Sequence, residues 1–115
     1  MTARYYILDG TTPVPGADVR QWAAWLETAD RVVAQTSLTA DIQVSTVFVG
    51  MNPYPGVAPP RLFETLVLWP GSPLDGATAH TATWQMALAA HTAMLLRVRA
   101  VLSATAQGAT VVVSC

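Results

Sequence analysis

Residues 84–102, WQMALAAHTAMLLRVRAVL, decide the fold of this 115-residue chain. Apolar side chains and one histidine recur there at alternating steps of four and three, the spacing of one face of a helix. Thr83 precedes the stretch as a helix cap, and Gly108 is expected to end the helix. We therefore expect a long helix that buries a stripe consisting of Trp84, Leu88, His91, Leu95, Val98 and Leu102.

Strand patterns upstream of this helix predict a sheet for it to pack against. We expect strands at residues 4–8, 42–50 and 62–69, and a possible short strand at 36–39. Side chains of the strand at 42–50 alternate between the two faces of the sheet. Its core face is predicted to consist of Ile42, Val44, Thr46 and Phe48. The strand at 62–69 is apolar on both faces except at Glu64 and Thr65, which predicts a central strand or one covered by a partner.

The remaining segments divide into a second helix and several loops. Residues 17–34 have helical spacing, and Asp18 provides a negative charge that suits a helix start. Residues 11–16 and 51–61 contain two and four prolines, which remove backbone donors and predict irregular structure. Residues 72–82 are also expected to form a loop, with a turn at Asp75-Gly76.

The carboxyl-terminal tail has the composition of a strand. Val111, Val112 and Val113 lie consecutively between Thr110 and Ser114. Valines have high β propensity, and an extended segment left in water would expose unpaired backbone groups. We therefore expect residues 110–114 to form an edge strand that binds within its own sheet or to another chain.

The order of the expected elements favours one α+β domain over residues 1–115. It reads strand, helix, two or three strands, helix and possible strand, and a chain of this length fits one core. The predicted architecture is a small, mainly antiparallel sheet of three to five strands with two helices packed on one face.

The composition indicates a surface that meets a partner. Charged residues make up 11% of the chain and hydrophobic residues 52%, against about 25% charged residues in an average soluble domain. We expect a homo-oligomer or a stable complex with a protein partner. The alternative is that Thr, Ser, Gln and Gly cover the exterior.

Several partners and cofactors do not fit the sequence. A net charge of −1 provides no attraction for nucleic acid. The single cysteine, Cys115, excludes an intrachain disulfide and a cysteine metal site, and we expect no cofactor and no metal. The helix at 84–102 carries His91, Arg97 and Arg99, which makes it a poor membrane span, so no membrane partner is expected.

Four polar residues are candidates for a catalytic site, although the sequence contains no recognised catalytic motif. They are Asp9, Glu64, His80 and His91. A carboxylate that holds a histidine forms an acid and base pair. The competing interpretations are that Glu64 forms an ion pair with Arg4 or Arg61, and that His91 is a structural histidine in the core or in an interface.

Three aromatic residues are candidate binding residues. They are Trp25, which lies off the main face of its helix, Tyr54 in the proline-rich loop, and Trp69 at the end of a strand. Exposed aromatic side chains are enriched at protein interfaces. Trp25 fits a core position on a wide apolar stripe equally well.

Four segments together resemble a known group of proteins. They are Arg4-Tyr5-Tyr6-Ile7-Leu8-Asp9-Gly10, Ser45-Thr46-Val47-Phe48-Val49-Gly50, Leu62-Phe63-Glu64-Thr65, and Thr83-Trp84 followed by Ala90-His91. The chain is similar through these segments to small uncharacterised proteins carried by bacteriophages and prophages. The resemblance implies a phage origin. Because residues 1–10 contain no apolar stretch long enough for a signal peptide, we expect a location in the host cytoplasm, or in the virion for a structural protein. The resemblance implies no activity.

We therefore expect a phage-encoded protein-interaction module without catalysis. It would act as a virion or assembly component, or as an accessory factor that binds a host protein. The alternative is a small enzyme or ligand-binding protein that uses a histidine and carboxylate pair. A deep polar pocket joining His91 to Glu64 would favour this alternative.

Overall fold

The computed structural model describes residues 4–16, 18–52 and 58–114, except for the side chains of residues 105–114. Its strands are β1 (Tyr6–Asp9), β2 (Thr12–Pro15), β3 (Val32–Thr39), β4 (Ile42–Phe48), β5 (Phe63–Leu68) and β6 (Thr78–Thr81). Its helices are α1 (Val19–Thr28) and α2 (Trp84–Ser114). β1 and β2 form a two-stranded sheet, and β3, β4, β5 and β6 pair in that order in a four-stranded sheet. All pairs are antiparallel, which confirms the predicted α+β class.

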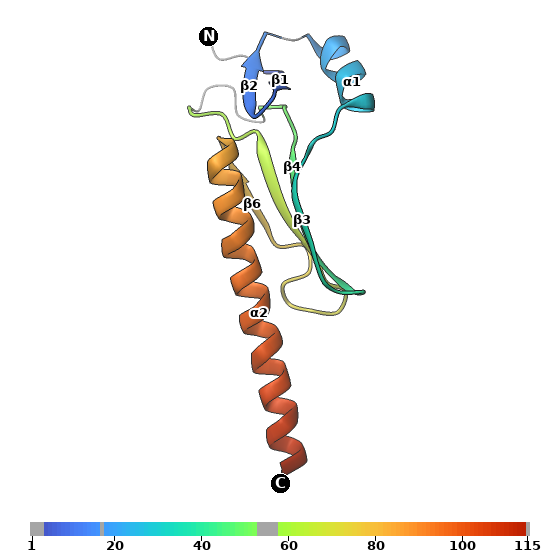
Figure 1. The fold of residues 1–115 in the computed structure, drawn as a ribbon, viewed down its shortest axis with the longest axis vertical. Coiled ribbons are helices and arrows are strands. Elements are labelled where there is room, and N and C mark those ends of the chain that lie inside the picture. Colours follow the sequence, from blue (N-terminus) through green and yellow to red (C-terminus); the bar gives the residue numbers. More distant parts are fainter. Residues whose placement is uncertain (1–3, 17, 53–57, 115) are drawn as a thin grey trace.

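The long helix α2 lies along one face of the four-stranded sheet and runs past its lower end (Figure 1). Its 31 residues span about 46 Å at 1.5 Å per residue. The other helix, α1, lies with the β1–β2 hairpin at the upper end of the molecule (Figure 1). Of the two helices, only α2 therefore covers the larger sheet.

The two faces of the four-stranded sheet differ in burial. We call the side that packs on α2 the covered face and the other side the open face, on which neither described helix packs. The covered face of β4 is the predicted one, with buried Ile42, Val44, Thr46 and Phe48. β5 lies between β4 and β6, which confirms its prediction as a central strand. Its covered face consists of Phe63, Thr65 and Val67, and its open face of Glu64, Leu66 and Leu68.

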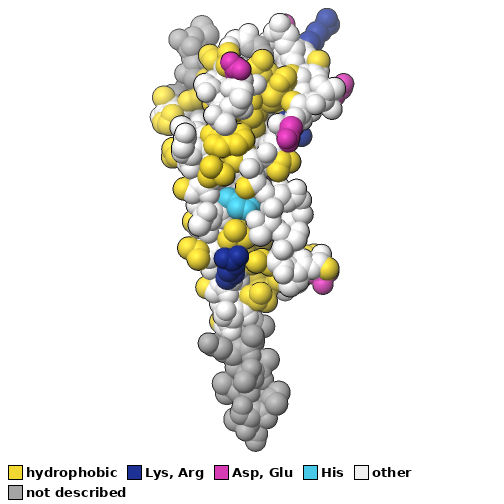
Figure 2. Space-filling model, viewed as in Figure 1, with side chains coloured by type: hydrophobic (Ala, Val, Ile, Leu, Met, Phe, Trp, Pro, Cys, Tyr) yellow, Lys and Arg dark blue, Asp and Glu magenta, His cyan; other side chains and the backbone are white. Residues whose placement is uncertain are grey.

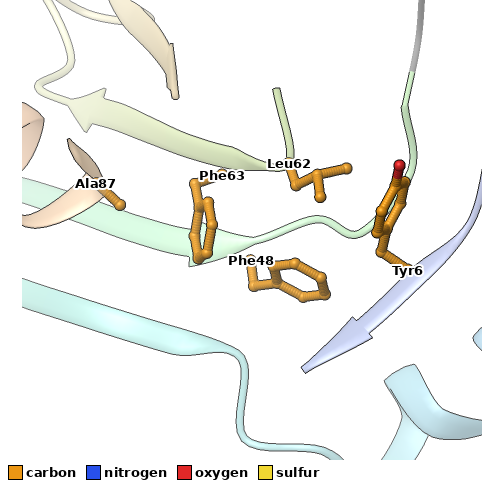
Figure 3. Close-up of a cluster of buried hydrophobic side chains, with 5 residues drawn as sticks. All are labelled: Tyr6, Phe48, Leu62, Phe63 and Ala87. Atoms are coloured by element: carbon orange, nitrogen blue, oxygen red, sulfur yellow. The ribbon is translucent and has the colours of Figure 1, made fainter. Parts of the chain in front are cut away.

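An aromatic cluster joins the sheet to both helices and the hairpin. It consists of the buried residues Tyr6, Phe48, Leu62, Phe63 and Ala87 (Figure 3). The rings of Phe48 and Phe63 meet edge to face with centroids 5.2 Å apart. Trp25 adds its ring to Phe48, and Trp84 adds its ring to Phe63. Such edge-to-face pairs stabilise beyond the area that they bury.

A second cluster fills the rest of the space between α2 and the sheet. It consists of Ile42, Val44, Val67, Met94 and Val98. The buried line of α2 is therefore Ala87, His91, Met94 and Val98. Leu88, predicted within the buried stripe, is 42% exposed. Ala87 and Met94 are buried beside His91 and Val98, so the buried side of α2 is rotated away from Leu88 relative to the predicted stripe.

The junction between the hairpin and β4 requires a glycine. Gly50 has a φ of +74°, and its carbonyl accepts the N–H of Tyr6 at 2.7 Å. A Cβ atom at this position would lie 2.5 Å from the carbonyl oxygen of Tyr6. Both the backbone conformation and the space therefore favour glycine here.

The prediction of irregular structure at residues 11–16 is wrong. Thr12–Pro15 forms β2, with Pro13 opposite Leu8 and Pro15 opposite Tyr6. A proline removes only one backbone donor, which a two-stranded ribbon tolerates on the edge that faces away from the partner. Gly10, with a φ of +63°, opens the two-residue loop between the strands.

The predicted helix at 17–34 is too long, although its start is right. Asp18 caps α1, and its side chain accepts the N–H of Gln21 while the Gln21 side chain accepts the N–H of Asp18. The helix ends at Thr28, because the Asp30 carboxylate accepts the N–H of Val32 and turns the chain into β3. The short strand predicted at 36–39 is the second half of β3.

The loop predicted at 72–82 contains a strand. Thr78–Thr81 forms β6 and pairs with β5. Four residues are too few for an alternating pattern to be recognised, and pairing with β5 stabilises a segment that its own composition does not define.

Both predictions for the carboxyl-terminal tail are wrong. α2 continues through Gly108 to Ser114, so the helix does not stop there and residues 110–114 do not form a strand. A glycine inside a helix costs about 1 kcal/mol relative to alanine, a cost that a helix already formed over the preceding turns can absorb. The side chains of Val111, Val112 and Val113 lie outside the described residues.

Candidate functional site

The two histidines lie on opposite faces of the four-stranded sheet. His91 contacts Thr46 on the covered face, whereas His80 lies on the open face beside Glu64. Side chains alternate along a strand, so Glu64 and its neighbour Thr65 point to different sides. The predicted alternative of a pocket joining His91 to Glu64 is therefore not formed.

His91 is enclosed by threonine hydroxyls. The residue is 5% exposed, its Nδ1 lies 2.8 Å from Thr46 Oγ1, and its Nε2 lies 3.0 Å from Thr36 Oγ1. The Thr46 hydroxyl also bonds to that of Thr65 at 2.7 Å. Desolvation by burial lowers the pKa of His91 from its usual 6.5, which favours the neutral ring. Both nitrogens have partners, which supports a structural role.

His80 and Glu64 form an exposed pair. The register of β5 and β6 places them opposite each other, and His80 Nε2 donates to Glu64 Oε2 at 3.1 Å. Their side chains are 45% and 35% exposed. Glu64 therefore pairs with His80, and the interpretation of an ion pair with Arg4 or Arg61 is wrong. Both residues are among the predicted candidates for a histidine and carboxylate pair, but their pairing with each other is not predicted, because the segment that carries His80 is expected to be a loop.

Two hollows border His80, and the first of them also borders Glu64. The first has a volume of about 170 Å³ and is lined by Val49, Met51, Arg61, Glu64 and His80. The second has a volume of about 390 Å³ and is lined by Pro59, Arg61, His80, Thr81, Ala82 and Met86. Arg61 and His80 belong to both hollows, and Arg61 was absent from the candidate site residues. We call the three side chains of Arg61, Glu64 and His80 the Arg61 site.

The Arg61 site has groups that can exchange a proton and hold a charge. Glu64 accepts the Nε2 proton of His80 and thereby fixes the tautomer of the neutral ring, so that Nδ1 can accept a proton. Arg61 adds a planar group with five N–H donors. The arrangement can bind an anionic group and can exchange a proton at Nδ1 of His80.

Asp9 is not part of either histidine environment. It ends β1 at an exposed position in the separate two-stranded sheet. Within the described ranges, the one ion pair is that of His80 with Glu64. In that same part of the chain, no group of three or more His, Cys, Asp or Glu residues could hold a metal.

The predicted aromatic binding residues have different positions. Trp25 is half-buried and packs its ring against Phe48, with centroids 5.6 Å apart. Trp69 is half-buried against the second core cluster, and its backbone N–H donates to Asp75 Oδ1. Tyr54 lies outside the described residues. The role of these residues in binding stays a prediction.

The outward side of α2 has almost no charge. Leu96 is 61% exposed and Met86 is 51% exposed, and Arg97 and Arg99 are the only charged residues of the helix. Exposed residues at steps of four, three and four form what we call the outward stripe, Ala89, Ala93, Leu96 and Ala100. Figure 2 shows a similar scarcity of charged side chains over the face in view, where hydrophobic side chains are spread along the described part.

Part of α2 is long and apolar enough to cross a membrane by length and composition. This stretch, Trp84–Ala104, has a mean hydropathy of 1.3. Its buried residues pack on the covered face of the sheet.

No family model, curated protein or solved structure matches this chain. The outward stripe and the Arg61 site are therefore the features from which a function can be inferred.

Proposed function

We propose that this chain is a protein-interaction module without catalysis of its own, and that it associates through the outward stripe of α2. The observation that carries the proposal is that α2 exposes an uncharged, apolar stripe on the side opposite the sheet, which covers only the other side of the helix. An apolar stripe on a helix normally packs against another surface. The outward stripe therefore needs a second surface.

A second copy of the chain is the partner that fits this stripe best. Two identical stripes pack on each other across a twofold axis, and no charge is buried because the stripe has none. At 100° per residue, Arg97 and Arg99 lie on either side of the stripe and stay in solvent. The steps of four, three and four and the small alanine side chains allow two helices to approach closely.

The resemblance to phage proteins supports two roles for such a module. It would be a virion or assembly component, or an accessory factor that binds a host protein in the host cytoplasm. Both roles need a stable protein-binding surface. Mass spectrometry of purified particles of the phage that carries the gene separates them, because only a virion component is retained in the particles.

Light scattering at about 50 micromolar chain tests the association. The wild-type protein should have at least twice the mass of one 12.2 kDa chain. The variant Leu96→Glu places a charge in the stripe and should have the mass of one chain, with its circular dichroism unchanged. The matched control is Gln35→Glu, which adds the same charge at an exposed position of β3 on the open face and should keep the wild-type mass.

Three results would contradict the proposal. The first is a wild-type protein with the mass of one chain, and the second is an unchanged mass for Leu96→Glu. The third is dissociation by Gln35→Glu alone, which would assign the interface to the open face. Binding of the wild-type protein to lipid vesicles, abolished by Leu96→Glu, would instead assign the stripe to a membrane.

A further inference from the structure

The two hollows beside Arg61 and His80 support an inference that does not depend on the α2 interface. Arg61 and His80 line both hollows, so a ligand in either hollow meets two side chains with N–H donors. Arg61 is exposed, and it forms no ion pair with any residue in the described ranges. A guanidinium in this state has its full fork of donors for a carboxylate or a phosphate.

Glu64 holds one nitrogen of the His80 ring and leaves the other available to a ligand. The carboxylate holds Nε2 at 3.1 Å and leaves Nδ1 as the ring nitrogen without a partner in the described part of the chain. In the protonated ring both nitrogens donate, one to Glu64 and one to the ligand. The pair is exposed, so it contributes little to folding and is accessible to a ligand.

The charges around the second hollow favour an anion. Among the described residues, its lining includes Arg61 and His80 and no carboxylate, and Glu64 lines the first hollow. The first turn of α2 contains no acidic residue, and Met86 in that turn lines the hollow. The positive end of the helix dipole adds to the field of the two side chains.

The sizes and walls of the hollows define the class of ligand. The second hollow, about 390 Å³, is in the range of pockets that hold small molecules. The first, about 170 Å³, adds an apolar wall from Val49 and Met51. We propose that the Arg61 site binds a small organic anion, a carboxylate or a phosphate monoester. Its charged group lies between Arg61 and His80, and its apolar part contacts Val49 and Met51.

Nuclear magnetic resonance of the two imidazole rings tests this site with phenyl phosphate and benzoate as probes. The ring signals of His80 should shift with at least one of the two anions and reach saturation, and the response to each separates phosphate from carboxylate recognition. The signals of His91 should stay in place and serve as an internal control. The variant Arg61→Gln should weaken binding at least tenfold, whereas Arg20→Gln, at an exposed position of α1, should leave it unchanged.

Two further probes separate charge from shape. Benzyl alcohol has the ring without the charge and should not bind, and inorganic phosphate should bind at least tenfold more weakly than phenyl phosphate. The Leu96→Glu variant should bind the anions like the wild type, so failure of the interface proposal does not affect this test. The inference is overturned if neither anion shifts His80 saturably, if Arg61→Gln binds like the wild type, or if benzyl alcohol or inorganic phosphate binds as tightly as phenyl phosphate.

Discussion

On the covered face of the four-stranded sheet, His91 lies between the hydroxyls of Thr36 and Thr46 and is 5% exposed. On the open face, His80 has a carboxylate partner and a side chain that is 45% exposed. Adjacent residues of β5 contribute to the two environments. The Thr65 hydroxyl bonds to Thr46, which contacts His91, and the Glu64 carboxylate accepts from His80. Because a helix covers only one face of this sheet, neighbouring residues of a strand have different environments. One position packs in the core, and the next is accessible to a ligand.

The largest expected difference between the faces is at another pair of neighbours on β5. Phe63 is fully buried and contacts the rings of Phe48 and Trp84, so Phe63→Ala should lower the free energy of unfolding by about 3–5 kcal/mol. Glu64→Ala removes only an exposed pair and should lower it by less than about 1 kcal/mol. Urea denaturation followed by circular dichroism measures both. Equal losses would show that the open face is packed as tightly as the covered one.

A smaller difference is expected between the two histidines. His91→Gln disturbs hydrogen bonds with Thr36 and Thr46 and should cost about 1–3 kcal/mol at pH 8. His80→Gln should change stability by less than about 0.5 kcal/mol. Thermal unfolding of both variants beside the wild type gives the comparison. A larger loss for His80→Gln would reverse the roles assigned to the two rings.

The smallest expected effect is in the pH dependence of stability. Because burial lowers the pKa of His91, the unfolded chain binds more protons at this residue once the pH falls through its usual 6.5. The melting temperature of the wild type should therefore decrease more than that of His91→Gln between pH 8 and pH 5. Parallel curves for the wild type and His91→Gln would mean that His91 titrates alike in the folded and unfolded chain.

The covered face could be predicted from the sequence because its signals are local. The alternation from Ile42 to Phe48 specifies which side of β4 is buried, and Thr83 marks the start of α2 by accepting the N–H of Met86. The burial of His91 followed from its place among apolar residues at helical spacing. These features depend on neighbours within one or two turns, and such neighbours are present in the sequence itself.

The Arg61 site could not be predicted because it depends on pairing between strands. Glu64 was recognised as unusual within an apolar strand, but its partner His80 lies on a four-residue strand without a pattern of its own. Arg61 becomes a candidate only when the hollows are known. In the tail, the propensity of three valines for strands was outweighed by continuation of a helix already formed, since extending a helix costs less than starting a new element.

Protection of a thiol at position 96 tests most directly whether the outward stripe is covered. Cys115 is the only cysteine, so a Cys115→Ser chain carrying Leu96→Cys has one thiol, and Gln35→Cys in the same background is the exposed control. At about 50 micromolar chain, position 96 should react with a maleimide at least tenfold more slowly than position 35, and dilution to the single-chain state should abolish the difference. Equal rates at both positions in the concentrated sample would contradict association through α2.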